Sequence, residues 1–125
     1  MTPDELRQAC LSLPGADETC PFSEGLSVFK VEGKIFAITR LDGVPLEVSL
    51  KCEPELAEQL RVTHPAIRAG YHLNKRHWNT VTIDGSVPDA MVLSLVEDSW
   101  ALVVDGLPRR VRERLTAEGR RPSRL

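Results

Sequence analysis

The first apolar residues of the chain recur every three to four positions, which is the period of a helix with one buried face. Thr2-Pro3-Asp4-Glu5 supplies a capping threonine, a proline suited to the first helical position and the glutamate of a capping box. Pro14-Gly15 stops the pattern. We therefore expect a helix between these two signals and a polar loop over 16–21. The apolar face of this helix would be Leu6, Ala9, Cys10 and Leu13.

The next apolar residues alternate with polar ones, which predicts three strands, over 26–31, 34–39 and 46–51. Glu32-Gly33 and Asp42-Gly43 stand between these strands and are residue pairs typical of tight turns. Connections this short cannot join parallel strands. The pattern therefore predicts a three-stranded antiparallel meander.

Helical and extended patterns alternate again in the second half of the chain. Glu53-Pro54-Glu55 begins a short helix, and a loop is expected around 63–65 and 69–70. Two more strands are predicted over 71–73 and 78–83.

The longest helix is predicted over 88–104, because Gly106 and Pro108 follow it as stop signals. A short surface helix is expected around Val111 and Leu115. The order of elements predicts the α+β class, with an antiparallel sheet of about five strands and helices packed on one face. The long helix would face this sheet with Val92, Leu95, Val96, Ser99 and Val103.

Composition narrows the class of protein without giving a function. With 125 residues, 42% of them apolar and 27% charged, the chain has the size and make-up of one globular domain. We expect this domain over 1–116 and a basic C-terminal tail over 117–125. No apolar run approaches the roughly 20 residues that span a bilayer, and no secretory signal is recognised. A cytoplasmic location is expected, with three free thiols at Cys10, Cys20 and Cys52.

The charges are distributed unevenly along the chain. Residues 1–60 carry five Lys and Arg against eleven Asp and Glu, a net charge of −6, whereas residues 61–125 carry eleven against seven, a net charge of +4. This asymmetry is typical of a basic face that meets an anionic partner. Charge alone is better explained by an acidic end and a basic end that are both simply solvated.

The densest chemistry lies in 71–79, which reads Tyr-His-Leu-Asn-Lys-Arg-His-Trp-Asn. Lys75 and Arg76 are cations that can pair with phosphates, and the amides of Asn74 and Asn79 can read base edges. The competing interpretation is a polar turn between two strands. Trp78 is expected to be a structural anchor buried in the core, since a large ring at the start of a strand usually packs there.

This stretch, extended to Val81, resembles the signature of the MmcQ/YjbR family of small bacterial proteins. The segments 84–89 and 99–103 continue the resemblance, which covers the chain from Thr2 to about Leu115. The resemblance implies a fold similar to frataxin-like CyaY, with an antiparallel sheet flanked by helices. It also implies DNA binding through wing-like hairpins. The Arg-rich tail lies outside the shared region.

Metal binding and catalysis receive little support from the sequence. His64, His72 and His77 together with the cysteines have no spacing typical of a structural zinc site, so neither metal nor cofactor is expected. No GxSxG, Walker, GxGxxG or HExxH motif is present. A reactive Cys20 would need His72 or His77 close in space. We expect no enzymatic activity.

The leading hypothesis is a protein that binds DNA, or another polyanion, weakly and with little sequence preference. One group of contacts would come from the loop and the other from an Arg-rich segment near the C-terminus. The alternative is a non-enzymatic protein-interaction module with no nucleic acid involved. The residues predicted to contact DNA are Asn74, Lys75, Arg76, His77, Asn79, Arg109, Arg110, Arg112 and Arg114.

Overall fold

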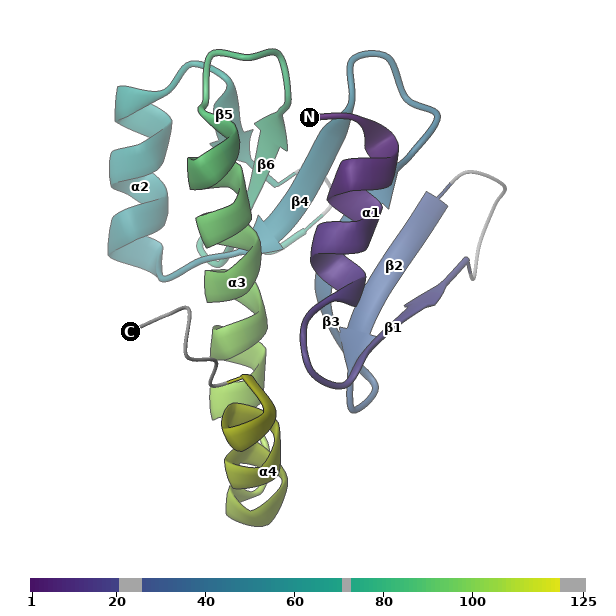
Figure 1. Cartoon of the computed structure of the whole chain (residues 1–125). Helices are drawn as coiled ribbons and strands as arrows, with labels where there is room; N and C mark the ends of the chain where they lie inside the picture. The colour runs from purple at the N-terminus through teal and green to yellow at the C-terminus, as the bar shows by residue number, and fades with distance from the viewer. Residues whose placement is uncertain (21–25, 71–72, 120–125) are drawn as a thin grey trace.

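The computed structural model describes residues 1–20, 26–70 and 73–119 (Figure 1). Within these ranges, six strands form one antiparallel sheet in the order β1-β2-β3-β4-β6-β5, accompanied by four helices. The predicted α+β class is therefore confirmed. The elements are α1 Pro3–Leu11, β1 Ala16–Thr19, β2 Leu26–Val31, β3 Lys34–Arg40, β4 Glu47–Lys51, α2 Pro54–Thr63, β5 Ile67–Ala69, β6 Trp78–Thr82, α3 Asp89–Asp105 and α4 Arg109–Gly119.

The capping box predicted for the first helix is present. The hydroxyl of Thr2 accepts a hydrogen bond from the backbone N–H of Glu5 at 3.1 Å, and the Glu5 carboxylate accepts one from the N–H of Thr2 at 2.9 Å. Two N–H groups that the helix itself leaves unpaired are thereby satisfied.

Two strands form where the sequence predicts loops. β1 pairs antiparallel with β2, although its residues include the acidic pair Asp17 and Glu18. An edge strand is held largely by main-chain hydrogen bonds, so it needs few apolar side chains, and charges are common there. β5 is anchored in the sheet by one buried side chain, Ile67, which lies opposite Val81. The strand predicted over 71–73 falls partly on residues 71–72, outside the described residues.

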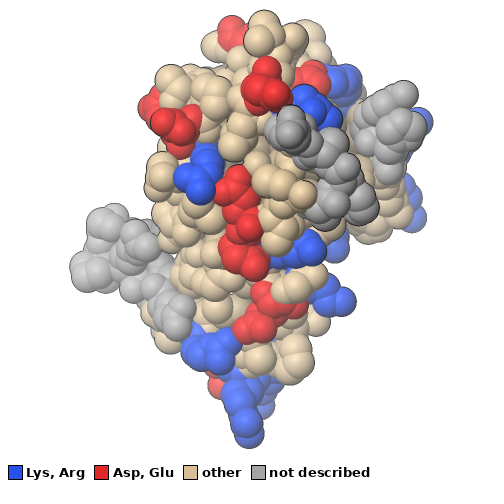
Figure 2. Space-filling view, turned by 90° about the vertical axis from the view of Figure 1, so that its right-hand side faces the viewer, with Lys and Arg blue, Asp and Glu red and all other residues tan. Residues whose placement is uncertain are grey.

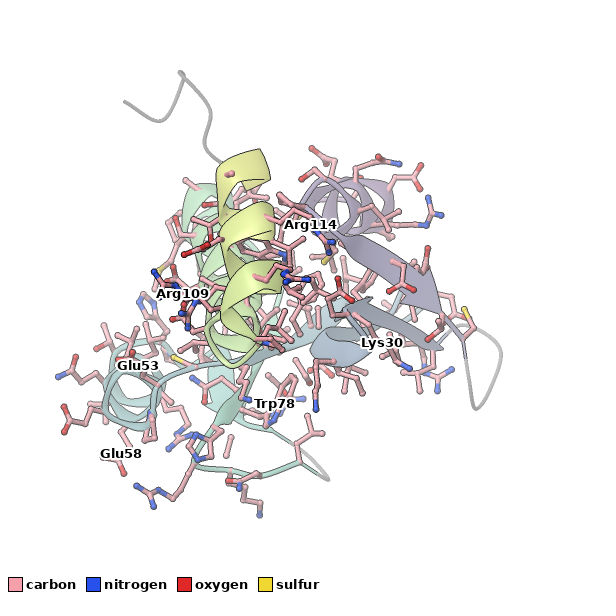
Figure 3. The ribbon with its side chains drawn as sticks, turned by 90° about the horizontal axis from the view of Figure 1, so that it is seen from below. Lys30, Glu53, Glu58, Trp78, Arg109 and Arg114 are labelled. Atoms are coloured by element: carbon pink, nitrogen blue, oxygen red, sulfur yellow. The ribbon has the colours of Figure 1, made fainter. Side chains whose placement is uncertain are left out.

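The helices cover one face of the sheet, as predicted (Figures 1 and 3). α3 crosses β3 and β4, α1 lies beside α3, and α2 packs against β5 and β6. On α3 the predicted core residues Val92, Val96 and Val103 are buried, and Leu95 is half-buried. α4 closes one end of the core by burying Leu115.

A buried hydroxyl joins α3 to the middle of the sheet. Ser99 donates a hydrogen bond to the carbonyl oxygen of Phe36 on β3 at 2.5 Å and accepts one from the N–H of Lys51 on β4 at 2.8 Å. Phe36 is the extra residue of a bulge opposite Phe29 and Lys30. The serine therefore satisfies two main-chain groups at a point where the strand ladder is irregular.

The described cysteines are free, as predicted: Cys10 and Cys52 are buried, and Cys20 is exposed. Among the described residues, no helix combines the length and the apolar character needed to cross a membrane.

Candidate nucleic-acid interface

The loop over 74–77 is a compact turn that leads directly into β6. The side-chain oxygen of Asn74 accepts a hydrogen bond from the N–H of Arg76 at 3.0 Å, and its carbonyl oxygen accepts bonds from the N–H groups of His77 and Trp78 at 3.1 and 2.9 Å. The side chains of Asn74, Lys75 and Arg76 are exposed, and that of His77 is half-buried. Two adjacent cations therefore face solvent from a backbone that the turn itself holds in place.

Arg61 on α2 fixes this loop from the helix side. Its Nη1 donates hydrogen bonds to the carbonyl oxygen of Lys75 at 3.0 Å and to Oδ1 of Asn79 at 2.9 Å. No sequence pattern marks Arg61 as part of a site, because an arginine at the end of a surface helix ordinarily caps that helix or is solvated. Only the packing of α2 on β6 shows its role.

The prediction that Asn79 contacts DNA is wrong. Its side chain is 3% exposed on the sheet face that the helices cover. Its Nδ2 donates to the carbonyl oxygen of Ala57 at 3.3 Å, and its Oδ1 accepts from Arg61. The amide therefore joins α2 to β6 and does not reach a base edge.

Trp78 also differs from expectation. Successive residues of a strand point to opposite faces of the sheet, and Asn79 faces the helices, so Trp78 faces away from them (Figure 3). The ring is half-buried and is not part of the apolar core. Gly70 makes this placement possible, because a β-carbon there would lie 2.9 Å from the Cβ of Trp78.

The face of the sheet that no described helix covers is named the open face here. One row of residues crosses it over all six strands, each opposite the next in the strand register. The hydroxyls of Ser49 and Thr80 are joined by a hydrogen bond of 2.8 Å in the middle of this row. The row consists of Thr19, Val28, Ile38, Ser49, Thr80 and Arg68.

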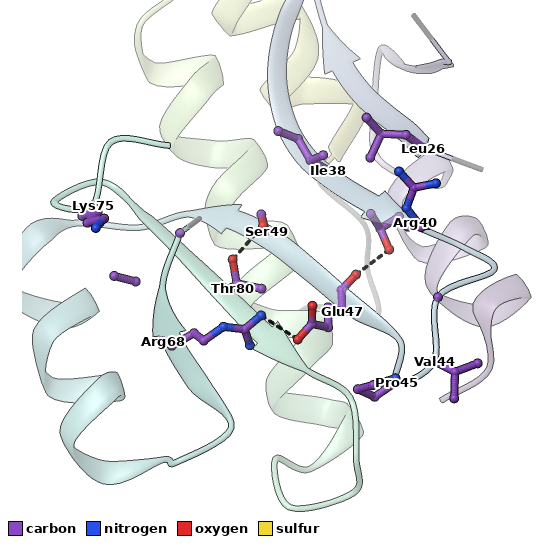
Figure 4. Close-up of a pocket in the computed structure, with 14 residues that line it drawn as sticks. Leu26, Ile38, Arg40, Val44, Pro45, Glu47, Ser49, Arg68, Lys75 and Thr80 are labelled. Atoms are coloured by element: carbon purple, nitrogen blue, oxygen red, sulfur yellow. Dashed lines mark hydrogen bonds and ion pairs between the residues drawn. The ribbon is translucent and has the colours of Figure 1, made fainter. Parts of the chain in front are cut away.

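A groove of about 780 Å³ lies on the open face, between the β3–β4 loop and the residues around β5 (Figure 4). Ser49 and Thr80 form part of its floor. Its apolar lining includes Leu26, Ile38 and Val44, of which Val44 is 97% exposed at the tip of the β3–β4 loop. The groove thus offers hydroxyls and apolar side chains to a ligand.

The charged residues of the groove are Arg40, Arg68, Lys75 and a single acid, Glu47. Arg68 Nη2 lies 2.6 Å from Glu47 Oε2, and the Thr82 hydroxyl donates to the same oxygen at 3.1 Å. The negative charge of Glu47 is therefore neutralised by Arg68. Three cations against one acid leave the groove positive, beside a loop that adds Arg76.

The predicted Arg strip lies on α4, on the helix-covered side of the sheet (Figure 3). Arg109 Nε pairs with Glu113 at 2.9 Å, and Arg114 Nη2 pairs with Glu32 at 2.7 Å. Arg112 donates to the carbonyl oxygen of Asp105 at 3.3 Å, and Arg110 is exposed. Figure 2 shows basic side chains gathered at the lower end of the molecule, over α4, with acidic ones above them. The structure therefore does not bring the strip and the loop onto one face.

The alternatives for metal and thiol chemistry gain no support from the described residues. No group of three His, Cys, Asp or Glu side chains is placed to hold a metal ion within 1–20, 26–70 and 73–119. The exposed Cys20 has its Sγ 3.9 Å from the Ser27 hydroxyl. Its proposed partner His72 lies outside the described residues. The expectations of no metal, no cofactor and no catalysis stay predictions.

Comparison with known proteins places the groove and the loop in a shared region. The YjbR family model matches residues 11–102, which include both. An uncharacterised protein YjbR of Escherichia coli K12 is 42% identical over 115 residues, covering 92% of this chain and 98% of its own length. An uncharacterised protein YbdF of E. coli O157:H7 is 38% identical over 110 residues, covering 87% and 89%.

Two solved structures share the fold. A crystal structure of a Deinococcus radiodurans protein superposes with a TM-score of 0.86 at 43% identity, over 92% of this chain and 88% of the other. A crystal structure of a Pseudomonas syringae protein gives a TM-score of 0.66 at 27% identity, over 79% and 96%. The likeness to frataxin-like CyaY stays a prediction.

Proposed function

The chain belongs to the YjbR family, and from that premise we propose that it binds DNA weakly and with little sequence preference. The binding surface is the loop over 74–77 together with the groove on the open face. The proposal includes no catalytic step. The observation that carries it is the charge of this surface, where Arg40, Arg68, Lys75 and Arg76 surround one acid that is already paired.

The loop cations of this surface suit phosphates because the backbone that carries them is already ordered, so binding loses little conformational entropy there. The turn bonds within 74–77 and the bond from Arg61 to the carbonyl oxygen of Lys75 fix the backbone under Lys75 and Arg76 before any ligand arrives. Contacts to phosphate carry no sequence information, so binding through them is tolerant of sequence. The affinity of such contacts comes largely from counterion release and therefore falls with salt.

The Arg strip of α4 is left out of this site. Three of its four arginines already bond to groups of the protein, and α4 faces the other side of the sheet. A ligand on the open face cannot touch both surfaces without passing around the end of the sheet. Because Arg68 is already paired with Glu47, this revision reduces the expected number of phosphate contacts to about three, which equals the net positive charge of the groove and the loop.

The test is a fluorescence-anisotropy titration of the full chain with a labelled mixed-sequence duplex at several salt concentrations. We expect a Kd tighter than about 10⁻⁶ M at about 50 mM salt, and a slope of log affinity against log salt near −2 to −3. Three duplexes of unrelated sequence should bind with similar affinity. A Kd weaker than about 10⁻⁶ M at that salt for both this duplex and a single strand of the same sequence, or affinity that does not change with salt, overturns the proposal.

A protein-interaction module is the second candidate, and the apolar part of the groove favours it. Leu26, Ile38 and the fully exposed Val44 would suit an apolar side chain of a partner protein. Such binding would change little between low and high salt, because it buries apolar surface rather than releasing counterions. The salt titration therefore distinguishes the two functions.

A further inference from the structure

We infer that the nucleic acid bound by the open face is single-stranded, and that Trp78 is the platform on which a base stacks. This inference rests on the proposed function and makes its ligand more specific. It begins from the position of Trp78, the first residue of β6, on the open face and directly opposite Lys51 of β4. Lys75 precedes it by three residues in the loop, and Gly70, which lines the groove, lies against its Cβ.

The environment of Trp78 is that of a supported but accessible ring. Trp78 is half-buried, so neighbours hold it in place while the residue keeps some exposure to solvent. Figure 3 shows it on the side of the sheet away from α1, α3 and α4. A large apolar ring outside the core, with Lys51 opposite it in the strand register and Lys75 in the loop before it, is suited to stacking on an unpaired base whose phosphates meet nearby cations.

Trp100, the second tryptophan of the chain, has a different role. Its indole N–H donates to the carbonyl oxygen of Pro14 at 2.9 Å, and the ring packs against the core from α3. Trp100 therefore joins α3 to the turn between α1 and β1 on the helix-covered side of the sheet. It serves as an internal reference for any signal assigned to Trp78.

The groove beside Trp78 suits a single strand better than a duplex. Its volume of about 780 Å³ is that of a small-ligand pocket, so it can admit a base or a nucleotide. The bases of a duplex are stacked on one another and paired, and they cannot enter such a groove or cover an indole. A single strand can turn its bases toward the sheet.

The groups inside and around the groove have separate tasks in this arrangement. Arg40, Arg68 and Lys75 lie where a strand crossing the sheet would present phosphates. The half-buried Ser49 hydroxyl is bonded to the buried hydroxyl of Thr80 and can still make a further hydrogen bond as donor or acceptor, so it fits any base edge without selecting one. Stacking on Trp78 is equally tolerant, because every base has a π-face.

The experiment compares a labelled strand of about ten thymidines with a duplex of the same length, by anisotropy and by intrinsic tryptophan fluorescence. A strand of this length lies within the site sizes known for sheet-based single-strand binders. For the wild-type chain we expect at least about tenfold tighter binding of the single strand, with quenching of the fluorescence. Quenching should persist in Trp100→Phe, where Trp78 is the remaining tryptophan, and disappear in Trp78→Phe.

The affinity for the single strand should depend on whether position 78 carries an aromatic ring. It should therefore largely survive Trp78→Phe, although the fluorescence signal of Trp78 is lost. Trp78→Leu is expected to weaken single-strand binding roughly 5- to 100-fold, the loss of one stacked base, and Trp78→Phe much less. Circular dichroism checks that each variant is folded, and the quenching of Trp100→Phe tests the stacking even where Trp78→Leu does not fold. Equal or tighter binding of the duplex, or no quenching in Trp100→Phe, overturns this inference alone. Absence of binding by both ligands overturns the proposed function as well.

Discussion

Arg61 on α2 and Asn79 on β6 are joined by a hydrogen bond of 2.9 Å from the guanidinium Nη1 to the side-chain oxygen. The same nitrogen lies 3.0 Å from the carbonyl oxygen of Lys75. One side chain outside the groove thus connects a buried amide of the sheet to the backbone of the loop that carries two of the proposed DNA contacts. The shape of the loop depends on α2 as much as on its own turn.

Arg61→Ala is expected to lower the free energy of unfolding by about 2 kcal/mol. The substitution leaves the buried oxygen of Asn79 without its charged donor, and an unpaired buried acceptor costs about 1–3 kcal/mol. The measurement is urea unfolding followed by circular dichroism. Gln59→Ala, at an exposed site on the same helix, should stay within about 0.5 kcal/mol of wild type. Additive effects of Arg61→Ala and Asn79→Ala in a double-mutant cycle would contradict the link between them.

Ser99→Ala should be among the more damaging single changes in α3. It removes the donor to Phe36 and the acceptor for Lys51, and both main-chain groups then lose their partner in the interior. We expect a loss of roughly 2–4 kcal/mol in the free energy of unfolding, since each orphaned group costs about 1–3 kcal/mol. Ser94→Ala is the matched control on the exposed face and should be neutral or slightly stabilising. Similar unfolding midpoints for the two variants would refute the role given to Ser99.

The three thiols should differ widely in reactivity. Burial, with a smaller contribution from the negative charge of Glu18, raises the pKa of the Cys10 thiol to about 12. Burial and the nearby charge of Asp98 raise the pKa of Cys52. Because the thiolate is the reactive form, a chromogenic thiol reagent at about pH 8 should modify one thiol quickly in the native protein. In denaturant it should modify three.

The fast reaction belongs to the exposed Cys20 and should be absent from Cys20→Ser. Fast modification of two or three thiols in the folded protein would show that Cys10 or Cys52 is accessible. A count of one in denaturant without reductant would reveal a disulfide.

Asp98→Asn should stabilise the protein at neutral pH. Partial burial raises the pKa of Asp98, and the negative charges of Glu97 and Glu53 raise it further. A raised folded-state pKa means that the folded state favours the protonated acid. The unfavourable effect of the charge is therefore absent below the unfolded value near 3.8 and develops as the pH rises through the folded pKa. We expect a gain on the order of 0.5 kcal/mol at about pH 7, because the site is partly screened by solvent, and none at about pH 3.

Asp84→Asn is the control of opposite sign. Hydrogen bonds from the hydroxyl and the N–H of Ser86 hold the pKa of Asp84 below its ordinary value. Stability from its charge is present at neutral pH and lost as the pH falls through the folded pKa, so this variant should lose stability near pH 7. Urea midpoints at the two pH values check both variants. A gain for Asp98→Asn that is equal at both would contradict the electrostatic explanation.

Local signals in the sequence predict the elements whose stability is local. The capping box at Thr2 and the apolar face of α3 are examples, because caps and helical periodicity act within a few turns. β1 and β5 were missed because their residues are held by partners distant in the chain: Ala16 by Val31, and Ile67 by Val81. Pairing of this kind leaves little trace in a short segment of sequence.

The site was predicted in part for the same reason. The exposed cations Lys75 and Arg76 follow from a polar turn that the sequence shows directly. The faces on which Trp78 and Asn79 lie depend on strand register, since a shift of one residue exchanges the two. The sequence pattern therefore predicts a buried Trp78 and an exposed Asn79, whereas in the structure the Asn79 amide is buried and the Trp78 ring lies outside the core.

The claim that the open face, and not α4, binds nucleic acid is tested most directly by comparing Lys75→Ala with Arg110→Ala. Each variant removes one positive charge from an exposed side chain, so their net charges are identical and only the face differs. The measurement is the slope of log affinity for the labelled single strand against log salt. Lys75→Ala should reduce the magnitude of the slope by about 0.7 and weaken binding at low salt, because one phosphate contact is lost. Arg110→Ala should leave both unchanged. Equal losses in the two variants, or a larger loss in Arg110→Ala, would contradict the account.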